Sequence, residues 1–156
     1  MEFEEYKQEE PGEEDYVDIY SGKTIFGFAI FSTMYAGVLL IINLWVAGYK
    51  QIISQVVLFI LGFSFLSRYV VQLLGFKIDL VALQKTIAAK KQLTNEQLLQ
   101  LSAVTAVQIG LNVIAGLVLT RYFFKKYFPD DDYYPRPIYR PVIIFIILIL
   151  FLGFII

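Results

Sequence analysis

Four long blocks of apolar residues dominate the chain, and polar or charged segments separate them. The blocks lie at about 24–47, 52–74, 98–122 and 141–156. At a rise of 1.5 Å per residue the first three reach about 35 Å as helices, which exceeds the roughly 30 Å hydrocarbon core of a bilayer. The pattern therefore predicts an all-α polytopic membrane protein with three to four transmembrane helices. We expect it to be integral and multi-pass, in a membrane that the sequence does not identify.

The segments between the blocks add local detail. A short turn at 48–51 predicts that the first two helices form an antiparallel hairpin. Apolar residues at helical spacing within 78–89 predict a short amphipathic helix on the membrane surface. Thr94 and Gln97 have the spacing of a capping box, so the third helix is expected to begin before its apolar block and to run until Pro129 stops it.

The last block and the orientation of the chain allow several interpretations. Sixteen residues from Pro141 make only about 24 Å of helix, which is shorter than the hydrocarbon core. This helix therefore crosses a thinned bilayer, stops halfway or is shielded by a partner. If all four blocks cross, each side of the membrane receives six Lys and Arg residues, and the positive-inside rule selects neither orientation.

Charge divides the chain into two parts. The chain is 58% hydrophobic and 17% charged, whereas a soluble domain averages about 25% charged residues. Residues 1–22 have a net charge of −8, and residues 23–156 have a net charge of +7. We expect an acidic disordered tail over 1–22 and a helical membrane domain over 23–156. The tail either acts as a soluble spacer or docks on a basic partner surface, and its charge argues against nucleic acid as a partner.

Several kinds of chemistry have no candidate residues. The 156 residues include no His and no Cys, which removes the usual ligands of zinc, haem and iron–sulfur clusters and the Cys–His nucleophiles. No Asp or Glu occurs within 19–78 or within 97–129. The blocks there lack paired carboxylates for acid–base catalysis or cation transport. We therefore expect no enzymatic activity, no cofactor and no metal site.

Polar side chains within the second and third blocks form two stripes. Arg68, the only charged residue deep inside a block, shares a helix face with Gln72. Thr105, Gln108 and Asn112 share one face of the third helix. Because the two helices are antiparallel and the stripes lie at similar depth, we predict that Arg68 donates a hydrogen bond to Gln108 or Thr105. Otherwise Arg68 extends to the interface or binds a substrate or a lipid headgroup.

The first block carries small and polar residues of its own. Ala29, Thr33 and Gly37 follow a small-xxx-small spacing, which allows helix backbones to approach closely. Asn43 is a further candidate for a polar contact inside the membrane. This face is expected to pack either against the other helices of the chain or against another subunit.

Together these features favour one function over two others. Packing faces, a short last helix and the lack of catalytic residues indicate a small non-catalytic membrane subunit of a larger complex, with an accessory, assembly or scaffolding role. Its partners would be other membrane protein subunits and the lipid bilayer. The alternative is a homo-oligomeric transporter or channel lined by Thr105, Gln108 and Asn112, where Arg68 favours anions. A membrane enzyme has the least support, because it would depend on Arg, Lys, Tyr or interfacial Asp alone.

Overall fold

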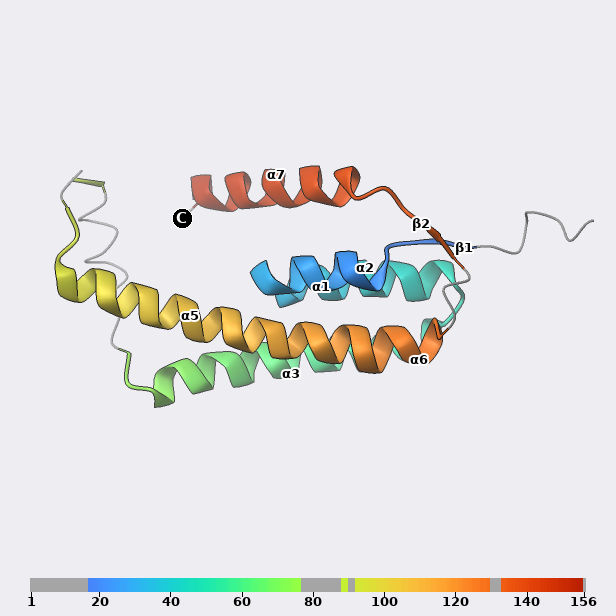
Figure 1. Cartoon of the computed structure of the whole chain (residues 1–156), viewed down its shortest axis with the longest axis horizontal. Coiled ribbons are helices and arrows are strands. Elements are labelled where there is room, and N and C mark those ends of the chain that lie inside the picture. Colours follow the sequence, from blue (N-terminus) through green and yellow to red (C-terminus); the bar gives the residue numbers. More distant parts are fainter. Residues whose placement is uncertain (1–16, 77–87, 90–91, 130–132, 156) are drawn as a thin grey trace, which may run out of the picture.

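The computed structural model describes residues 17–76, 88–89, 92–129 and 133–155. These residues form a mostly helical protein with a small two-stranded sheet (Figure 1). In chain order the elements are β1 (Val17–Ile19), α1 (Gly22–Phe31), α2 (Thr33–Val46), α3 (Lys50–Leu73), α5 (Asn95–Leu117), the π-helix η2 (Val118–Phe124), α6 (Lys125–Tyr127), β2 (Tyr133–Pro135) and α7 (Tyr139–Ile155).

Two helices are long and apolar enough to cross a membrane. α3 has 24 residues, and α5 continues through η2 and α6 to make one helix of 33 residues from Asn95 to Tyr127. These lengths correspond to about 36 and 50 Å. The predicted capping box is present, since Thr94 Oγ1 accepts from the Gln97 N–H and the Gln97 side chain accepts from the Thr94 N–H. α1, α2 and α7 are apolar but shorter.

The first apolar block forms two helices, which corrects the single span expected over 24–47. α1 ends at Phe31, and the backbone of Ser32 is extended, with φ −154° and ψ 106°. The Ser32 N–H donates to the Phe28 carbonyl at the end of α1, and the Ser32 side chain accepts from the Tyr35 N–H at the start of α2. Ser32 thus caps both helices, which is why the chain can break here without leaving these backbone groups unpaired.

Contacts between Asn43 and the chain just before this block show that the chain reverses. The Asn43 side chain donates from Nδ2 to the Tyr20 carbonyl at 2.7 Å, and its Oδ1 accepts from the Tyr20 N–H at 2.8 Å. In one continuous helix these residues would be about 35 Å apart. α1 and α2 are therefore an antiparallel hairpin, and we call its turn at Ser32 the tip. The ten residues of α1 extend about 15 Å, so the hairpin ends well short of the far end of α3 (Figure 1).

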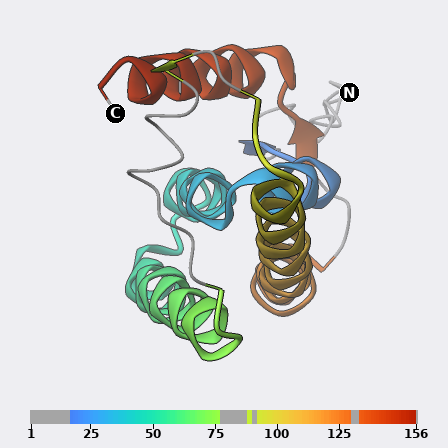
Figure 2. The same ribbon diagram turned by 90° about the vertical axis from the view of Figure 1, so that its left-hand side faces the viewer.

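The hairpin lies on the pair formed by α3 and α5, with α1 against α5 and α2 against α3 (Figure 2). Glycines allow close approach at both contacts. A Cβ on Gly116 of α5 would lie 2.8 Å from the Cβ of Ala29, and a Cβ on Gly37 would overlap the side chain of Ile60 on α3. Ala29, Thr33 and Gly37 are all buried. The small-residue face therefore packs against helices of the same chain.

The sheet joins the start of the hairpin to the segment before α7. β1 and β2 are parallel, and beyond them the Arg136 N–H donates to the Ile19 carbonyl at 2.8 Å. Residues 17–22 of the expected tail are thus ordered, because β2 and Asn43 bind their backbone. Residues 1–16 lie outside the described residues, as does nearly all of the expected amphipathic helix. The strand register pairs Val17 with Tyr133, Asp18 with Tyr134 and Ile19 with Pro135.

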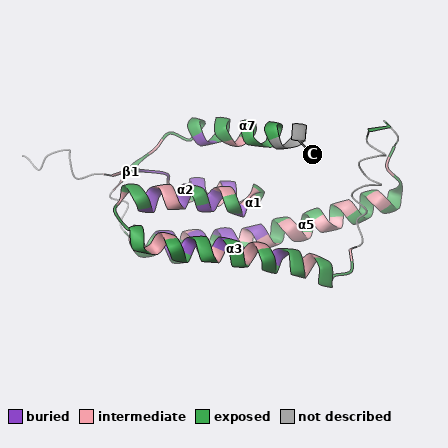
Figure 3. Cartoon of the chain, turned by 180° about the vertical axis from the view of Figure 1, so that it is seen from behind, coloured by how far each residue is buried: buried purple, intermediate pink, exposed green. Residues whose placement is uncertain are grey.

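α7 lies on the opposite side of the hairpin from α3 and α5 (Figures 1 and 2). The Tyr35 hydroxyl donates to the Pro141 carbonyl at 2.6 Å. The Phe145 ring packs against the rings of Phe28 and Tyr35, with centroids 5.5 and 4.9 Å apart. Residues 146–151 are exposed (Figure 3). The last apolar block is therefore one helix, attached to the hairpin near its N-terminal end.

Candidate functional site: a polar cavity at the hairpin tip

Polar side chains gather where the tip meets α5, and Asn112 is their centre. Asn112 is only 6% exposed. Its Oδ1 accepts from Thr33 Oγ1 at 3.0 Å and from Gln108 Nε2 at 3.1 Å, and its Nδ2 donates to the Ile30 carbonyl at 3.1 Å. The Ile30 carbonyl needs such a partner because α1 ends one residue later. Asn112 thus fastens the hairpin to α5.

α3 joins this network through Ser67. The buried Ser67 hydroxyl donates to Gln108 Oε1 at 3.2 Å. Among the described residues, no hydrogen bond joins Arg68 to Gln108 or Thr105, and the Thr105 hydroxyl instead donates to the Leu101 carbonyl of its own helix at 2.8 Å. Successive residues of an α-helix are rotated by about 100° about the helix axis. The neighbour of Arg68 therefore occupies the position that the sequence pattern assigned to Arg68.

Arg68 lines an open cavity of about 590 Å³ between the tip, α3 and α5, which we call the tip cavity. Its other polar side chains are Gln72, Thr105, Gln108 and Asn112. Arg68, Gln72 and Thr105 are exposed, whereas Gln108 is half-buried. An adjoining cavity of about 300 Å³ shares Arg68, Gln108 and Asn112. The apolar lining residues of the tip cavity are Ile30, Phe31, Val71, Val104 and Ile109.

The tip cavity lies between the tip, α3 and α5, and both of these long helices extend beyond the hairpin (Figure 1). Arg68 is five residues from Leu73, or about 8 Å along the helix axis from the end of α3. The C-terminus of α1 and the N-terminus of α2 meet at the tip, so their opposite dipole charges offset each other. Arg68 is then the only formal charge among the described residues that line the cavity. The cavity suits a carboxylate or another polar acceptor, to which Arg68 and Gln72 can donate.

Asn43 lies at the other end of the hairpin, away from the tip cavity. Its side chain is 1% exposed and binds both backbone groups of Tyr20. Its role in this structure is to hold the chain that follows β1 against α2. Sequence reasoning named Asn43 but not its partner, because a backbone group has no signature in the sequence. It also missed Ser67 and the capping role of Ser32.

Comparisons with known proteins do not supply a function. No protein-family model, no curated protein and no solved structure matches this chain. Among the described residues, no cluster of three or more His, Cys, Asp or Glu side chains could hold a metal ion. A function must therefore be inferred from the tip cavity and from the way the helices are arranged around it.

Proposed function

We propose that this protein is a small non-catalytic subunit of a larger membrane protein complex, and that its tip cavity receives a transmembrane helix of a partner. Arg68 carries the proposal. It is exposed, it lines an open polar cavity, and it lies on a helix long enough to cross a membrane. In a bilayer such an arginine faces a bundle interior or water and pairs with another group. No Asp or Glu that could pair with Arg68 occurs within 19–78 or 97–129. We therefore propose that the partner supplies the carboxylate.

The hairpin also leads to a proposed orientation. Because α1 and α2 reverse, β1 and the turn after α2 lie on the same side as α6 and β2, and the end of α3 and the start of α5 lie on the other side. The first side then has eight Lys and Arg residues and the second has four. By the positive-inside rule the first side, with the acidic tail, faces the cytoplasm. The eight are Lys7, Lys23, Lys50, Arg121, Lys125, Lys126, Arg136 and Arg140, and the four are Lys77, Lys85, Lys90 and Lys91.

Native mass spectrometry of a mild-detergent extract tests the subunit role. We expect a hetero-complex of fixed stoichiometry, which Arg68→Leu dissociates. Removing one member of a buried charge pair costs about 2–5 kcal/mol, or at least about 30-fold in affinity. Arg140→Leu is the matched control, since Arg140 is exposed at the start of α7 and outside the cavity. A purely homo-oligomeric wild type would contradict the subunit role, and a hetero-complex that survives Arg68→Leu would contradict the partner's position.

A homo-oligomeric transporter or channel is the second candidate, because the hairpin ends partway along α3 with an open polar cavity beside it. Half-helices that end within a membrane line the substrate sites of several transporters. The two candidates differ in whether water reaches Thr105. The native chain has no Cys, so Thr105→Cys can be probed alone with an aqueous thiol reagent. A pore requires modification in the native assembly, whereas a partner helix requires protection that is lost when Arg68→Leu is added.

A further inference from the structure

A second open cavity lies at the other end of the molecule, between the start of α1 and the end of the 33-residue helix. Its volume is about 770 Å³, within the range of roughly 300–1,000 Å³ that is typical of small-molecule sites. Three exposed cationic side chains line it: Lys23 from α1, Arg121 from η2 and Lys125 from α6. None of the described residues that line it is acidic. We call this cavity the basic groove.

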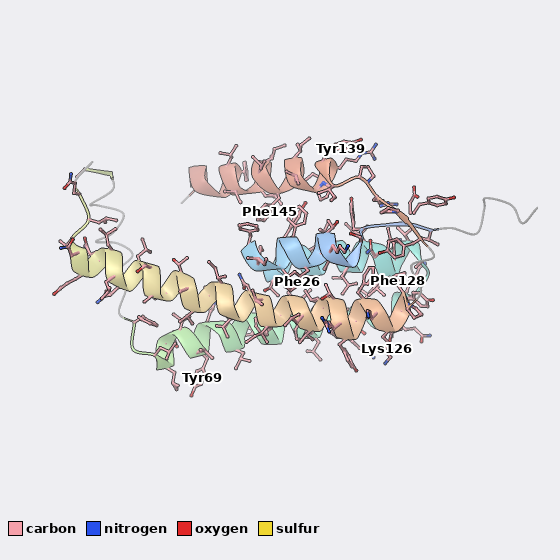
Figure 4. All side chains as sticks on the ribbon, in the orientation of Figure 1. Phe26, Tyr69, Lys126, Phe128, Tyr139 and Phe145 are labelled. Carbon is pink, nitrogen blue, oxygen red and sulfur yellow. The ribbon has the colours of Figure 1, made fainter. Side chains whose placement is uncertain are left out.

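Aromatic rings form the apolar part of the basic groove. Phe124 is 5% exposed, and Phe26 and Phe128 are half-buried. Phe26 lies between α1 and α5 (Figure 4). A Cβ on Gly22 would lie 3.2 Å from the Phe124 ring, so the lack of a side chain at Gly22 lets this ring pack closely against the start of α1. The groove thus combines exposed cations with a more deeply placed apolar surface.

At the end of the long helix, two cationic side chains line the groove and a neighbouring one lies outside it. Arg121 and Lys125 are four residues apart across the end of η2, and both line the groove. π-helical turns occur often at functional sites. Lys126 does not line it; its Nζ lies 5.6 and 5.7 Å from the ring centroids of Tyr122 and Tyr127. Lys126 is therefore a matched control for Lys125.

In a bilayer the basic groove would lie at the level of the headgroups. The helix from Asn95 to Tyr127 is about 50 Å long, roughly 20 Å more than the hydrocarbon core. Residues 121–128 consist only of Arg, Lys, Tyr and Phe, a composition that suits the interface between membrane and water. The start of α1 lies beside this end, because Gly22 is next to Phe124.

We propose that the basic groove binds an anionic phospholipid, with its phosphate among Lys23, Arg121 and Lys125 and its glycerol and upper acyl chains on Phe26 and Phe124. Ammonium and guanidinium groups form charge-assisted hydrogen bonds with phosphate. With three cations and no acid in the described lining, the groove favours a lipid with a net negative charge over a zwitterionic one. This proposal requires that the chain is inserted in a bilayer, but it does not depend on a partner at the tip cavity.

Lipid titration of the purified full-length protein, followed by native mass spectrometry, tests the proposal. Phosphatidylglycerol and phosphatidylcholine with the same acyl chains serve as probes. Each Lys or Arg near a membrane surface contributes about 1 kcal/mol to anion binding, so Lys23→Gln should weaken phosphatidylglycerol binding about 5-fold. The variant Lys23→Gln/Arg121→Gln/Lys125→Gln should weaken it on the order of 100-fold. Lys126→Gln should bind like the wild type, and phosphatidylcholine binding should change little in any variant.

Three results would overturn the proposal. The first is equal affinity of the wild type for the two lipids. The second is a loss of phosphatidylglycerol binding that is equally large in Lys126→Gln and in Lys125→Gln, which would indicate a general charge effect. The third concerns the acidic tail: if phosphatidylglycerol binds only after the acids of residues 1–16 are replaced by their amides, the tail is the occupant of the groove. The single variants keep the test decisive if the triple variant fails to fold.

Discussion

Replacing Asn112 by Leu should release the hairpin tip from α5. Leu has the same branched arrangement of side-chain heavy atoms as Asn, but it cannot form the three hydrogen bonds that Asn112 makes at 3.0–3.1 Å. Hydrogen bonds between membrane helices contribute about 0.6 kcal/mol each on average, or roughly 1 kcal/mol for the two bonds that Asn112 Oδ1 accepts. The Ile30 carbonyl would also lose its side-chain partner, which costs about 1–3 kcal/mol. We therefore expect Asn112→Leu to lower the free energy of unfolding by about 2–4 kcal/mol.

Reversible unfolding in mixed detergent micelles, followed by far-UV circular dichroism, measures this difference. Thr105→Val is the matched control, because the Thr105 hydroxyl bonds only to the Leu101 carbonyl of its own helix. We expect the control to change the free energy of unfolding by less than about 0.5 kcal/mol. If Asn112→Leu stays within about 1 kcal/mol of the wild type, the network does not hold the hairpin in place.

Two further substitutions test the packing of the hairpin and the anchoring of its N-terminal end. Gly37→Ala should destabilise the protein by about 1–3 kcal/mol in the same assay, because the new Cβ overlaps Ile60. Gly62→Ala, where a Cβ meets nothing within 4 Å, should not. Asn43→Ala leaves both backbone groups of Tyr20 without their partner and should increase proteolytic cleavage near that residue. Unchanged cleavage would mean that Asn43 does not anchor this segment.

The sequence predicts local features well where a local signal exists. The apolar blocks predict helices, and the Thr94 capping box marks the start of α5. The reversal at Ser32 was missed because a continuous helix and a folded-back hairpin have the same apolar composition. The available signal was the Ser32–Thr33 pair in the middle of an apolar block, since Ser is a strong N-cap residue.

The candidate site was predictable in its residue types but not in its pairings. The stripes on the second and third blocks predict polar faces, and in the structure Ser67 rather than Arg68 bonds to Gln108. The rotation of α3 about its axis decides between these neighbours. That rotation depends on packing between distant segments, such as Ile60 against Gly37, which helical periodicity does not encode. For the same reason the basic groove was not foreseen, because its cations come from segments about 100 residues apart.

Cysteine accessibility in sealed vesicles tests the reversal of the first apolar block directly. Asp18, Gln51 and Gln92 are exposed, and the chain has no native Cys that would complicate single-Cys variants. We expect a membrane-impermeant thiol reagent to modify Asp18→Cys and Gln51→Cys from the same side, and Gln92→Cys from the opposite side. Modification of Asp18→Cys and Gln51→Cys from opposite sides would show that the block crosses the membrane once, which contradicts the hairpin and the proposed orientation.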